Sequence, residues 1–141
     1  MLKIGSEWNS GHNTFGEFFN ESVEMLREER VPTQTVDALV AGQGLERVDL
    51  IKIDVEGHEF QVLTGAVETI TRFRPQILIE VFEETLCRQG TCVEAVLGFL
   101  TTHGYALNEF SDVNGELVPL ASLPGNESRN LVALPREPEQ N

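Results

Sequence analysis

Residues 48–59 read Val48-Asp49-Leu50-Ile51-Lys52-Ile53-Asp54-Val55-Glu56-Gly57-His58-Glu59, an apolar run that ends in an acidic turn. The run has no clean alternation of polar and apolar residues, which is typical of a strand covered on both faces of its sheet. Gly57 permits a sharp turn after the strand. A helix is expected next, with an apolar face made of Phe60, Leu63, Ala66, Val67 and Ile70.

A second apolar strand follows that helix. The helix stops before Arg74-Pro75, and residues 76–82 then read Gln76-Ile77-Leu78-Ile79-Glu80-Val81-Phe82. Two such strands joined by a crossover helix must be parallel, because an antiparallel pair would need only a tight turn. The crossover is expected to be right-handed. The fold class predicted from residues 47–82 is therefore α/β.

The C-terminal third predicts one more helix and three strands. The helix begins at a capping box, Thr91-Cys92-Val93-Glu94, and ends at Gly104. Residues 105–110 and 116–120 are expected to form a hairpin of strands, and residues 131–134 a last strand. These strands would close the parallel unit in antiparallel fashion.

The N-terminal third carries weaker signals. Residues 1–14 are rich in Gly, Asn and Ser and predict loop, whereas apolar residues from Phe15 to Leu26 recur at helical spacing and predict a short helix. Residues 31–36 are β-prone, although Pro32 restricts them to a sheet edge or a strand start. Asp37 would then cap a brief helix over residues 38–41, which Gly42 would end.

Composition restricts the classes of partner. The 141 residues fit one domain, and 23 acidic against 10 basic residues give a formal net charge of −13. Such a charge repels nucleic acid and anionic membrane surfaces, so neither is an expected partner. No apolar run approaches the roughly 20 residues of a spanning helix, and the N-terminus shows no signal peptide. Cys87 and Cys92 are read as free thiols, and a cytoplasmic location is expected.

The acidic turn concentrates the side chains that could do chemistry. Ligands of open α/β sheets bind beyond the carboxyl ends of the strands, where Asp54, Glu56, His58 and Glu59 follow the first strand. Crowded carboxylates and an imidazole can supply a general base, and oxygen ligands also suit a divalent cation. Lys52 is expected to neutralise one carboxylate, and Glu80 to line the same crevice from the second strand.

Simpler explanations stand beside each of these residues. Acids at a helix start complement the helix dipole, which would account for Glu56 and Glu59. Lys52 could extend to the sheet edge, Glu80 could cap the next loop, and a lone His58 is more often a surface residue. Asp54 is harder to explain in this way, because it ends an apolar strand.

These residues carry a resemblance to a known family. The stretches 48–59, 62–66 (Val62-Leu63-Thr64-Gly65-Ala66) and 74–81 closely resemble the FkbM family of S-adenosylmethionine-dependent methyltransferases. Residues 31–39 resemble the approach to that motif, and residues 103–105 and 130–133 its closing strands. The match is strong over residues 31–82 and looser to about residue 134.

The resemblance implies a seven-stranded Rossmann-like sheet with Asp54 at the end of the fourth strand. It implies methyl transfer from S-adenosylmethionine to a small-molecule hydroxyl acceptor, a sugar or secondary metabolite. Asp54, Glu56 and His58 would then be catalytic, and Lys52, Glu59 and Glu80 would bind substrate. The family's earlier strands, with their glycine loop and ribose-binding acid, have no counterpart before residue 31, so the cofactor-binding residues stay unassigned.

The chain is accordingly divided into residues 1–30, a loop and short helix; residues 31–134, a partial methyltransferase domain; and residues 135–141, a polar tail. It is expected to be inactive alone and to bind S-adenosylmethionine weakly. Two alternatives are a non-catalytic pseudoenzyme or partner-binding half-domain, and a small metal-dependent hydrolase. The open edge of the strand over residues 48–53 predicts self-association, a separate N-terminal half as partner, or cover by residues 31–36.

Overall fold

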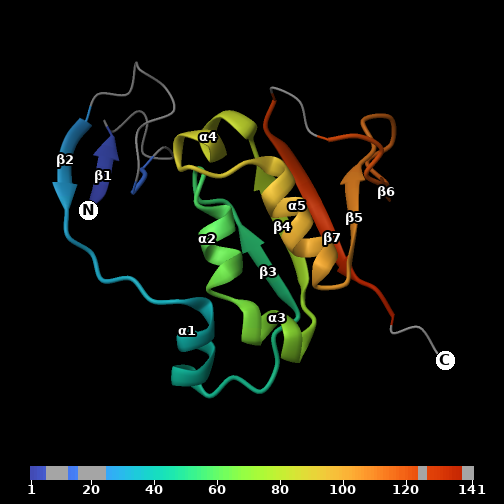
Figure 1. Cartoon of the computed structure of the whole chain (residues 1–141), viewed down its shortest axis with the longest axis horizontal. Coiled ribbons are helices and arrows are strands. Elements are labelled where there is room, and N and C mark those ends of the chain that lie inside the picture. Colours follow the sequence, from blue (N-terminus) through green and yellow to red (C-terminus); the bar gives the residue numbers. More distant parts are fainter. Residues whose placement is uncertain (6–12, 16–24, 124–126, 138–141) are drawn as a thin grey trace.

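A computed structural model describes residues 1–5, 13–15, 25–123 and 127–137. Its main body is a mixed sheet with helices on one face, and an N-terminal hairpin extends from that body (Figure 1). The hairpin pairs β1 (Leu2–Gly5) with β2 (Met25–Glu29) in antiparallel fashion. Thr14 bridges to Lys3 beside it.

The hairpin corrects two expectations for the N-terminal third. Residues 2–5 form a strand rather than loop, and residues 25–29 are a strand rather than the end of a helix. Backbone hydrogen bonds between β1 and β2 stabilise residues 25–29 as a strand. This pairing outweighs the local preference for a helix that the spacing of the apolar side chains indicated. Phe18, Phe19 and Val23, which carried most of that spacing, lie outside the described residues.

The main sheet has the strand order β3-β4-β7-β5-β6. Its strands are β3 (Leu50–Ile53), β4 (Gln76–Val81), β7 (Arg129–Pro135), β5 (Tyr105–Phe110) and β6 (Leu117–Pro119). The parallel pairing of β3 with β4 is confirmed, as is the β5–β6 hairpin. The last strand, β7, lies between β4 and β5 and is antiparallel to both.

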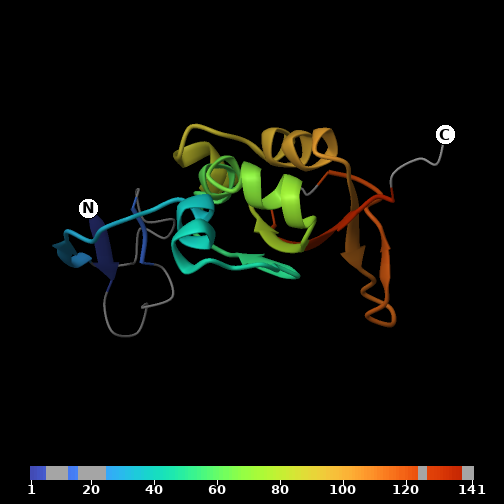
Figure 2. The ribbon, with the colours of Figure 1, turned by 90° about the horizontal axis from the view of Figure 1, so that it is seen from below.

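Five helices connect these strands within the described residues. They are α1 (Val36–Gln43), α2 (Glu59–Thr64), α3 (Val67–Phe73), α4 (Glu83–Arg88) and α5 (Val93–Thr102). Figure 2 shows α2, α3, α4 and α5 on the same side of the sheet. The expectation that β3 is covered on both faces is therefore wrong: Leu50 is 58% exposed, and Ile53 alone on that strand is buried.

The hydrophobic core fills the space between the sheet and these helices. The strands contribute Ile53, Ile77, Ile79, Val81, Tyr105, Leu131 and Ala133, and the helices contribute Leu63, Ile70, Leu86, Val96 and Leu100 among others. Side chains alternate along a strand, so the residues that follow Ile53 and Ile79 point toward the opposite face of the sheet. Those residues are Asp54 and Glu80.

The single helix expected after the acidic turn is two helices, α2 and α3, with a break at Gly65-Ala66. Ala66 has no side chain that could cap α3, and Asp37 supplies the cap from α1 instead. Asp37 was expected to cap its own helix, but Thr35 does so by accepting a hydrogen bond from Ala38 N at 3.1 Å. The break exists because α1 docks against the start of α3.

Two further helix ends differ from expectation. Helix α1 ends at Gly44, with φ 61°, rather than at Gly42. The N-cap of α5 is Cys92, which makes no capping hydrogen bond with its side chain, so the predicted capping box is wrong. Glu83 of the unpredicted helix α4 takes over that role, since its Oε2 accepts from Val93 N at 2.8 Å. Both cysteines are free thiols, as expected.

Two findings concern the outer surfaces. Among the described residues, no helix combines the length and the apolar character that membrane crossing requires. Strand β3 is an edge strand of the described sheet, and residues 31–36 do not pair with it, so the expected cover by that segment is wrong. Residues 31–35 form an extended connection, and Val36 begins α1.

Candidate functional site

The carboxyl ends of β3 and β4 bring two acidic residues together. The strands are parallel and in register, with Ile53 opposite Ile79. Asp54 and Glu80 are the next residues on each strand, and both point away from the helices. Their carboxyl groups are close enough for each to shift the pKa of the other. The sheet register thus places two carboxyl groups side by side at the edge where α/β proteins bind ligands.

Asp54 is held as a carboxylate by a neighbouring cation. Lys52 Nζ lies 2.8 Å from Asp54 Oδ2. The hydrogen bond and charge of Lys52, together with the hydrogen bond to Glu80, hold the pKa of Asp54 below its ordinary value. Both side chains remain partly exposed, so the carboxylate is accessible to a bound molecule.

The pKa of Glu80 shifts in the opposite direction. Burial raises the pKa of Glu80, and although the hydroxyl of Ser128 donates a hydrogen bond to its Oε1, the nearby carboxylates of Asp54 and Glu59 add to the rise. The environment therefore separates the proton affinities of two adjacent carboxyl groups.

Ser128 is a site residue that sequence reasoning missed. It directly precedes β7, whose antiparallel pairing with β4 places Arg129 opposite Val81 and Asn130 opposite Glu80. Its only sequence signal was the pattern Asn126-Glu127-Ser128, which points to glycosylation and not to this contact. Its position depends on which strand lies beside β4, and short-range patterns do not contain that information.

The acidic turn is rigidly built. Glu59 is 3% exposed, and its Oε1 accepts hydrogen bonds from Val55 N and Gly57 N, both at 3.2 Å. Glu56 adopts a left-handed conformation with φ 53°, which costs a non-glycine residue free energy. Gly57 has φ 98°, and a Cβ there would lie 2.4 Å from Thr85 O. Glu59 thus closes the turn that begins at Asp54.

His58 lies on the other side of that turn. Its ring meets Phe15 edge to face, with centroids 6.2 Å apart, and both line a cavity of about 520 Å³ with apolar Val36, Val55 and Val62. His58 Nδ1 is buried without a hydrogen-bond partner among the described residues. The structure therefore groups Lys52, Asp54 and Glu80, and places His58 with the apolar cavity.

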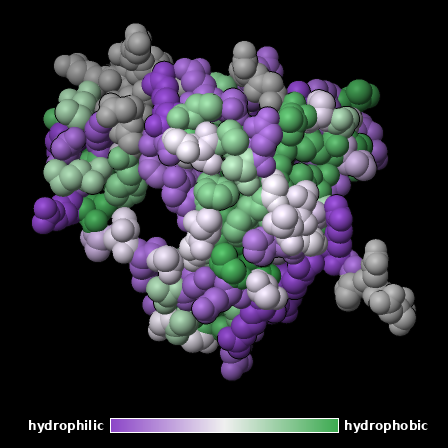
Figure 3. All heavy atoms as spheres, viewed as in Figure 1, coloured by the Kyte–Doolittle hydropathy of each residue, from purple (hydrophilic) through white to green (hydrophobic). Residues whose placement is uncertain are grey.

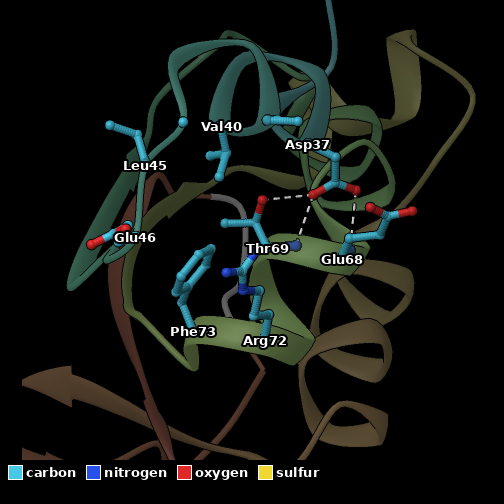
Figure 4. Close-up of a pocket in the computed structure, with 10 residues that line it drawn as sticks. Asp37, Val40, Leu45, Glu46, Glu68, Thr69, Arg72 and Phe73 are labelled. Carbon is cyan, nitrogen blue, oxygen red and sulfur yellow. Dashed lines mark hydrogen bonds between the residues drawn. The ribbon is translucent and has the colours of Figure 1, made fainter.

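A second cavity, of about 230 Å³, lies at the opposite ends of the strands between α1 and α3. Figure 4 shows Asp37 in this cavity, hydrogen-bonded to Thr69 and Glu68. Asp37 Oδ1 accepts from Thr69 N at 2.8 Å and from Thr69 Oγ1 at 2.6 Å, and Oδ2 accepts from Glu68 N at 3.1 Å. Burial raises the pKa of Asp37, but these hydrogen bonds outweigh burial and leave the pKa lowered. The acidic residue in the wall of this cavity, Asp37, is thus explained as the cap of α3.

The described residues contain no group of three or more His, Cys, Asp or Glu arranged to hold a metal ion. The cofactor that the resemblance implies, S-adenosylmethionine, combines an aromatic base with a positive charge. The aromatic and apolar walls of the 520 Å³ cavity fit the base, whereas no carboxylate of the described residues lines this cavity.

The chain is a mixed α/β domain with two neighbouring acidic residues at the ends of its parallel strands. The sequence model of the methyltransferase FkbM domain matches residues 4–107, and the chain therefore belongs to the FkbM methyltransferase family. The resemblance noted from the sequence is confirmed. The match extends upstream to residue 4 rather than beginning at residue 31, and it ends at residue 107, so the likeness of residues 130–133 to the closing strands of the family stays a prediction.

Two curated proteins are similar to the chain. The methyltransferase sdnD of Sordaria araneosa is 35% identical over 97 residues, which cover 69% of this chain and 36% of that protein. The AMB antimetabolite synthetase AmbE of Pseudomonas aeruginosa is 31% identical over 87 residues, which cover 60% of this chain and 4% of that protein. The chain thus spans about a third of sdnD and a small part of AmbE. No solved structure matches the chain.

Proposed function

We propose that the chain is the acceptor-side part of an S-adenosylmethionine-dependent O-methyltransferase, and that Asp54 and Glu80 together accept the proton of the acceptor hydroxyl. The observation that carries this proposal is the pair of carboxyl groups, with pKa values shifted in opposite directions, at the in-register ends of β3 and β4. Membership of the FkbM methyltransferase family supports methyl transfer as the reaction class.

The chemistry follows from the weakness of a hydroxyl as nucleophile. Loss of its proton as the new bond forms makes the oxygen far more reactive, and a positioned base contributes roughly 10²- to 10⁴-fold. Ionised Asp54, fixed by Lys52, can accept a hydrogen bond from the acceptor hydroxyl. Glu80, whose pKa is raised, is the stronger proton acceptor of the pair once it is ionised. The proton passes to the pair.

The cofactor would lie on the His58 side of the acidic turn. S-adenosylmethionine, when bound, supplies the electrophilic methyl group. Phe15, His58 and Val55 would hold its aromatic base in the 520 Å³ cavity, and the carboxylates would favour its positive charge. In the seven-stranded Rossmann-like sheet of the family, β3 would be the fourth strand, and the cofactor would contact further strands beside it.

The remaining predicted residues take supporting roles in this scheme. Lys52 keeps Asp54 ionised, and Glu59 shapes the turn through its bonds to Val55 and Gly57. Glu56, in its left-handed conformation, contributes to the sharpness of the same turn. Catalytic roles for Glu56 and His58 stay predictions from the sequence, and the described ring contact of His58 is with Phe15 in the apolar cavity.

A non-catalytic partner-binding half-domain is the second candidate function, and the edge position of β3 favours it. Such a module would bind a separate N-terminal half and contribute no proton transfer. A metal-dependent hydrolase gains no support, because the described residues offer no metal-ligand cluster.

The test is transfer of an isotopically labelled methyl group from S-adenosylmethionine to hydroxyl compounds by an assembly that contains this chain. A labelled methyl ether that disappears with Asp54→Asn supports the proposal. Methyl transfer that is unchanged by both Asp54→Asn and Glu80→Gln would favour the partner-binding module. Isothermal titration with S-adenosylmethionine and with magnesium separates cofactor binding from metal binding.

A further inference from the structure

The two cysteines of the chain lie on either side of the connection between α4 and α5, and the proposed reaction gives them no role. Cys87 is in the last turn of α4, and Cys92 is the N-cap of α5. Both are free thiols, of which Cys87 is exposed and Cys92 is partly exposed. Helix α4 lies on the helical side of the sheet, where Figure 3 shows hydrophilic residues interspersed with hydrophobic ones. Both thiols can therefore meet a small molecule from solvent.

The chain folds back on itself where α4 ends. Gly90 has the left-handed φ of 77°, and its N donates a hydrogen bond to Cys87 O at 3.0 Å. Thr91 N donates to Leu86 O at 3.1 Å. These two hydrogen bonds form a Schellman motif, which reverses the chain at the end of a helix. Thr91 is thus bonded to the residue before Cys87, and Cys92 follows directly, so the turn brings the two cysteines close together.

The carboxylate of Glu83, in the first turn of α4, connects the surroundings of the two cysteines. Its Oε1 accepts a hydrogen bond from Cys87 Sγ at 3.2 Å. Its Oε2 accepts one from the N of Val93, the residue after Cys92, at 2.8 Å. One carboxylate group therefore binds both the first thiol and the backbone beside the second. A disulfide requires Cα atoms about 4.4–6.8 Å apart, and this reversed connection suits such an approach without the unfolding of either helix.

The surroundings give the two thiols different reactivity. The Cys92 side chain makes no capping hydrogen bond at the start of α5. The hydrogen bond to Glu83 is the main reason that the pKa of Cys87 is raised, and the neighbouring charges of Glu94 and Cys92 add to the rise. Cys87 is thus held as a thiol, with Glu83 Oε1 placed to take its proton. Cys92 is the thiol that reacts first, because the thiolate is the reactive form.

We propose that Cys87 and Cys92 are a site of reversible oxidation, at which a neutral small-molecule disulfide produces one disulfide bond within the chain. The Cys92 thiolate attacks one sulfur of the reagent, and the half that leaves takes up the proton that Cys92 released to water. Cys87 then passes its proton to Glu83 and attacks the Cys92 sulfur, which releases the second half of the reagent with that proton. Two protein thiols are oxidised to one disulfide, and the reagent is reduced to two thiols.

The charges around the cysteines favour a neutral reagent over an anionic one. Glu83 and Glu94 both act electrostatically on the Cys87 thiol. Glu84, on the same helix as Cys87, is paired with Arg88 at 3.0 Å, so these two charges offset each other. The remaining negative charge repels an anionic disulfide.

Oxidation acts on the acidic turn through α4. Gly57 packs directly against this helix, since a Cβ at Gly57 would lie 2.4 Å from Thr85 O and 2.9 Å from Gln89 Cγ. A disulfide removes the thiol that donates to Glu83, and it constrains the connection that begins at Gln89. The backbone at Gly57 is therefore expected to respond to the redox state of the two cysteines.

The test is oxidation of the full 141-residue chain at low micromolar concentration with hydroxyethyl disulfide, followed by mass spectrometry without reductant. The wild type is expected to lose the mass of two hydrogen atoms. Cys87→Ser is expected to stop at a mixed disulfide between Cys92 and half of the reagent. Cys92→Ser is expected to react about tenfold more slowly than the wild type. Oxidised glutathione, an anionic disulfide, is expected to react about three- to tenfold more slowly than the neutral reagent.

A second readout follows the turn and requires no variant. In ¹⁵N-labelled wild type, the amide signal of Gly57 is expected to shift on oxidation and to return with reductant. The amide of Gly115, between β5 and β6, is the control and is expected to stay in place. An unchanged Gly57 signal in fully oxidised protein would refute the coupling to the acidic turn.

Three results would overturn the oxidation site: wild type that stops at a mixed disulfide, disulfides that form only between chains, or Cys92→Ser reacting as fast as the wild type. Oxidised glutathione reacting as fast as the neutral reagent would refute the class of reagent. Peptide mapping of the oxidised wild type keeps the test independent of how the variants fold, because trypsin cleaves after Arg88 and leaves two peptides joined through Cys87 and Cys92. None of these measurements requires methyl transfer, so the oxidation site and the proposed function fail separately.

Discussion

Asp54 and Glu80 lie side by side because they follow the in-register pair Ile53 and Ile79 on two parallel strands. Their pKa values are displaced in opposite directions. The cause lies in their surroundings: Lys52 stabilises the charge on Asp54, whereas burial penalises the charge on Glu80. Two neighbouring acids with different proton affinities are a common basis of acid–base chemistry.

Glu80→Gln is expected to make the protein more stable near neutral pH. The raised pKa of Glu80 means that its folded state favours the protonated form, whose stabilisation is lost as the pH rises through the folded pKa. Glutamine stays neutral and can keep the bond from Ser128. Urea unfolding should therefore show a gain near neutrality that shrinks as the pH falls through the folded pKa and is absent below the ordinary glutamate pKa of about 4.3. Glu94→Gln, at an exposed position on α5, is the control, and an equal gain there would contradict burial of Glu80 as the cause.

Gly57→Ala is expected to destabilise the fold by about 2–4 kcal/mol. The added Cβ would lie 2.4 Å from Thr85 O, and the residue has φ 98°. Gly98→Ala is the matched control, because its Cβ would meet nothing within 4 Å in α5. Removing a helical glycine there should stabilise by about 0.5–1 kcal/mol. Equilibrium unfolding measures the change in the free energy of unfolding for each variant. Changes of the same sign in Gly57→Ala and Gly98→Ala would show that the turn at Gly57 has room for a Cβ.

Asp37→Ala is expected to cost about 1–2 kcal/mol, since it removes the cap of α3. The lowered pKa of Asp37 means that this contribution is present at neutral pH and is lost as the pH falls through the folded pKa. Glu46→Ala, in the same cavity, should stay within about 0.5 kcal/mol of the wild type. If the two variants unfold alike at neutral pH, Asp37 does not cap α3.

The sequence predicted the part of the fold that depends on local pattern. The parallel unit of β3 and β4 follows from two apolar runs and the helical residues between them. Residues 25–29 do not end a helix because they pair with β1 as β2, and the single helix after the turn failed because Asp37 caps a new start at α3. Both errors come from contacts between distant segments.

The same distinction between local pattern and long-range contacts applies to the residues of the candidate site. Lys52, Asp54 and Glu80 could be chosen from the sequence because strand ends of a parallel pair meet at one edge. Ser128 could not, since its place depends on β7 lying beside β4. His58 was grouped with Asp54 by sequence proximity, but the sharp turn at Glu56 and Gly57 sends its ring toward Phe15.

The unpaired edge of β3 predicts that the chain associates with another chain. Leu50 is 58% exposed on this strand, and the described residues leave one side of it unpaired. We therefore expect the chain to self-associate or to bind a separate N-terminal half, and sedimentation velocity measures either outcome. Amide exchange at Leu50, Ile51 and Ile53 should be slow in the associated form. A stable monomer with fast exchange along β3 would refute this expectation.

The most direct measurement is the single-turnover rate of methyl transfer from labelled S-adenosylmethionine to a hydroxyl acceptor, compared among the wild type, Asp54→Asn and His58→Gln in an active assembly. If Asp54 and Glu80 accept the proton, Asp54→Asn lowers the rate by roughly 10²-fold or more, and His58→Gln has a much smaller effect. Small and equal losses in both variants would contradict the carboxyl pair as the base and leave the acidic turn with a structural role.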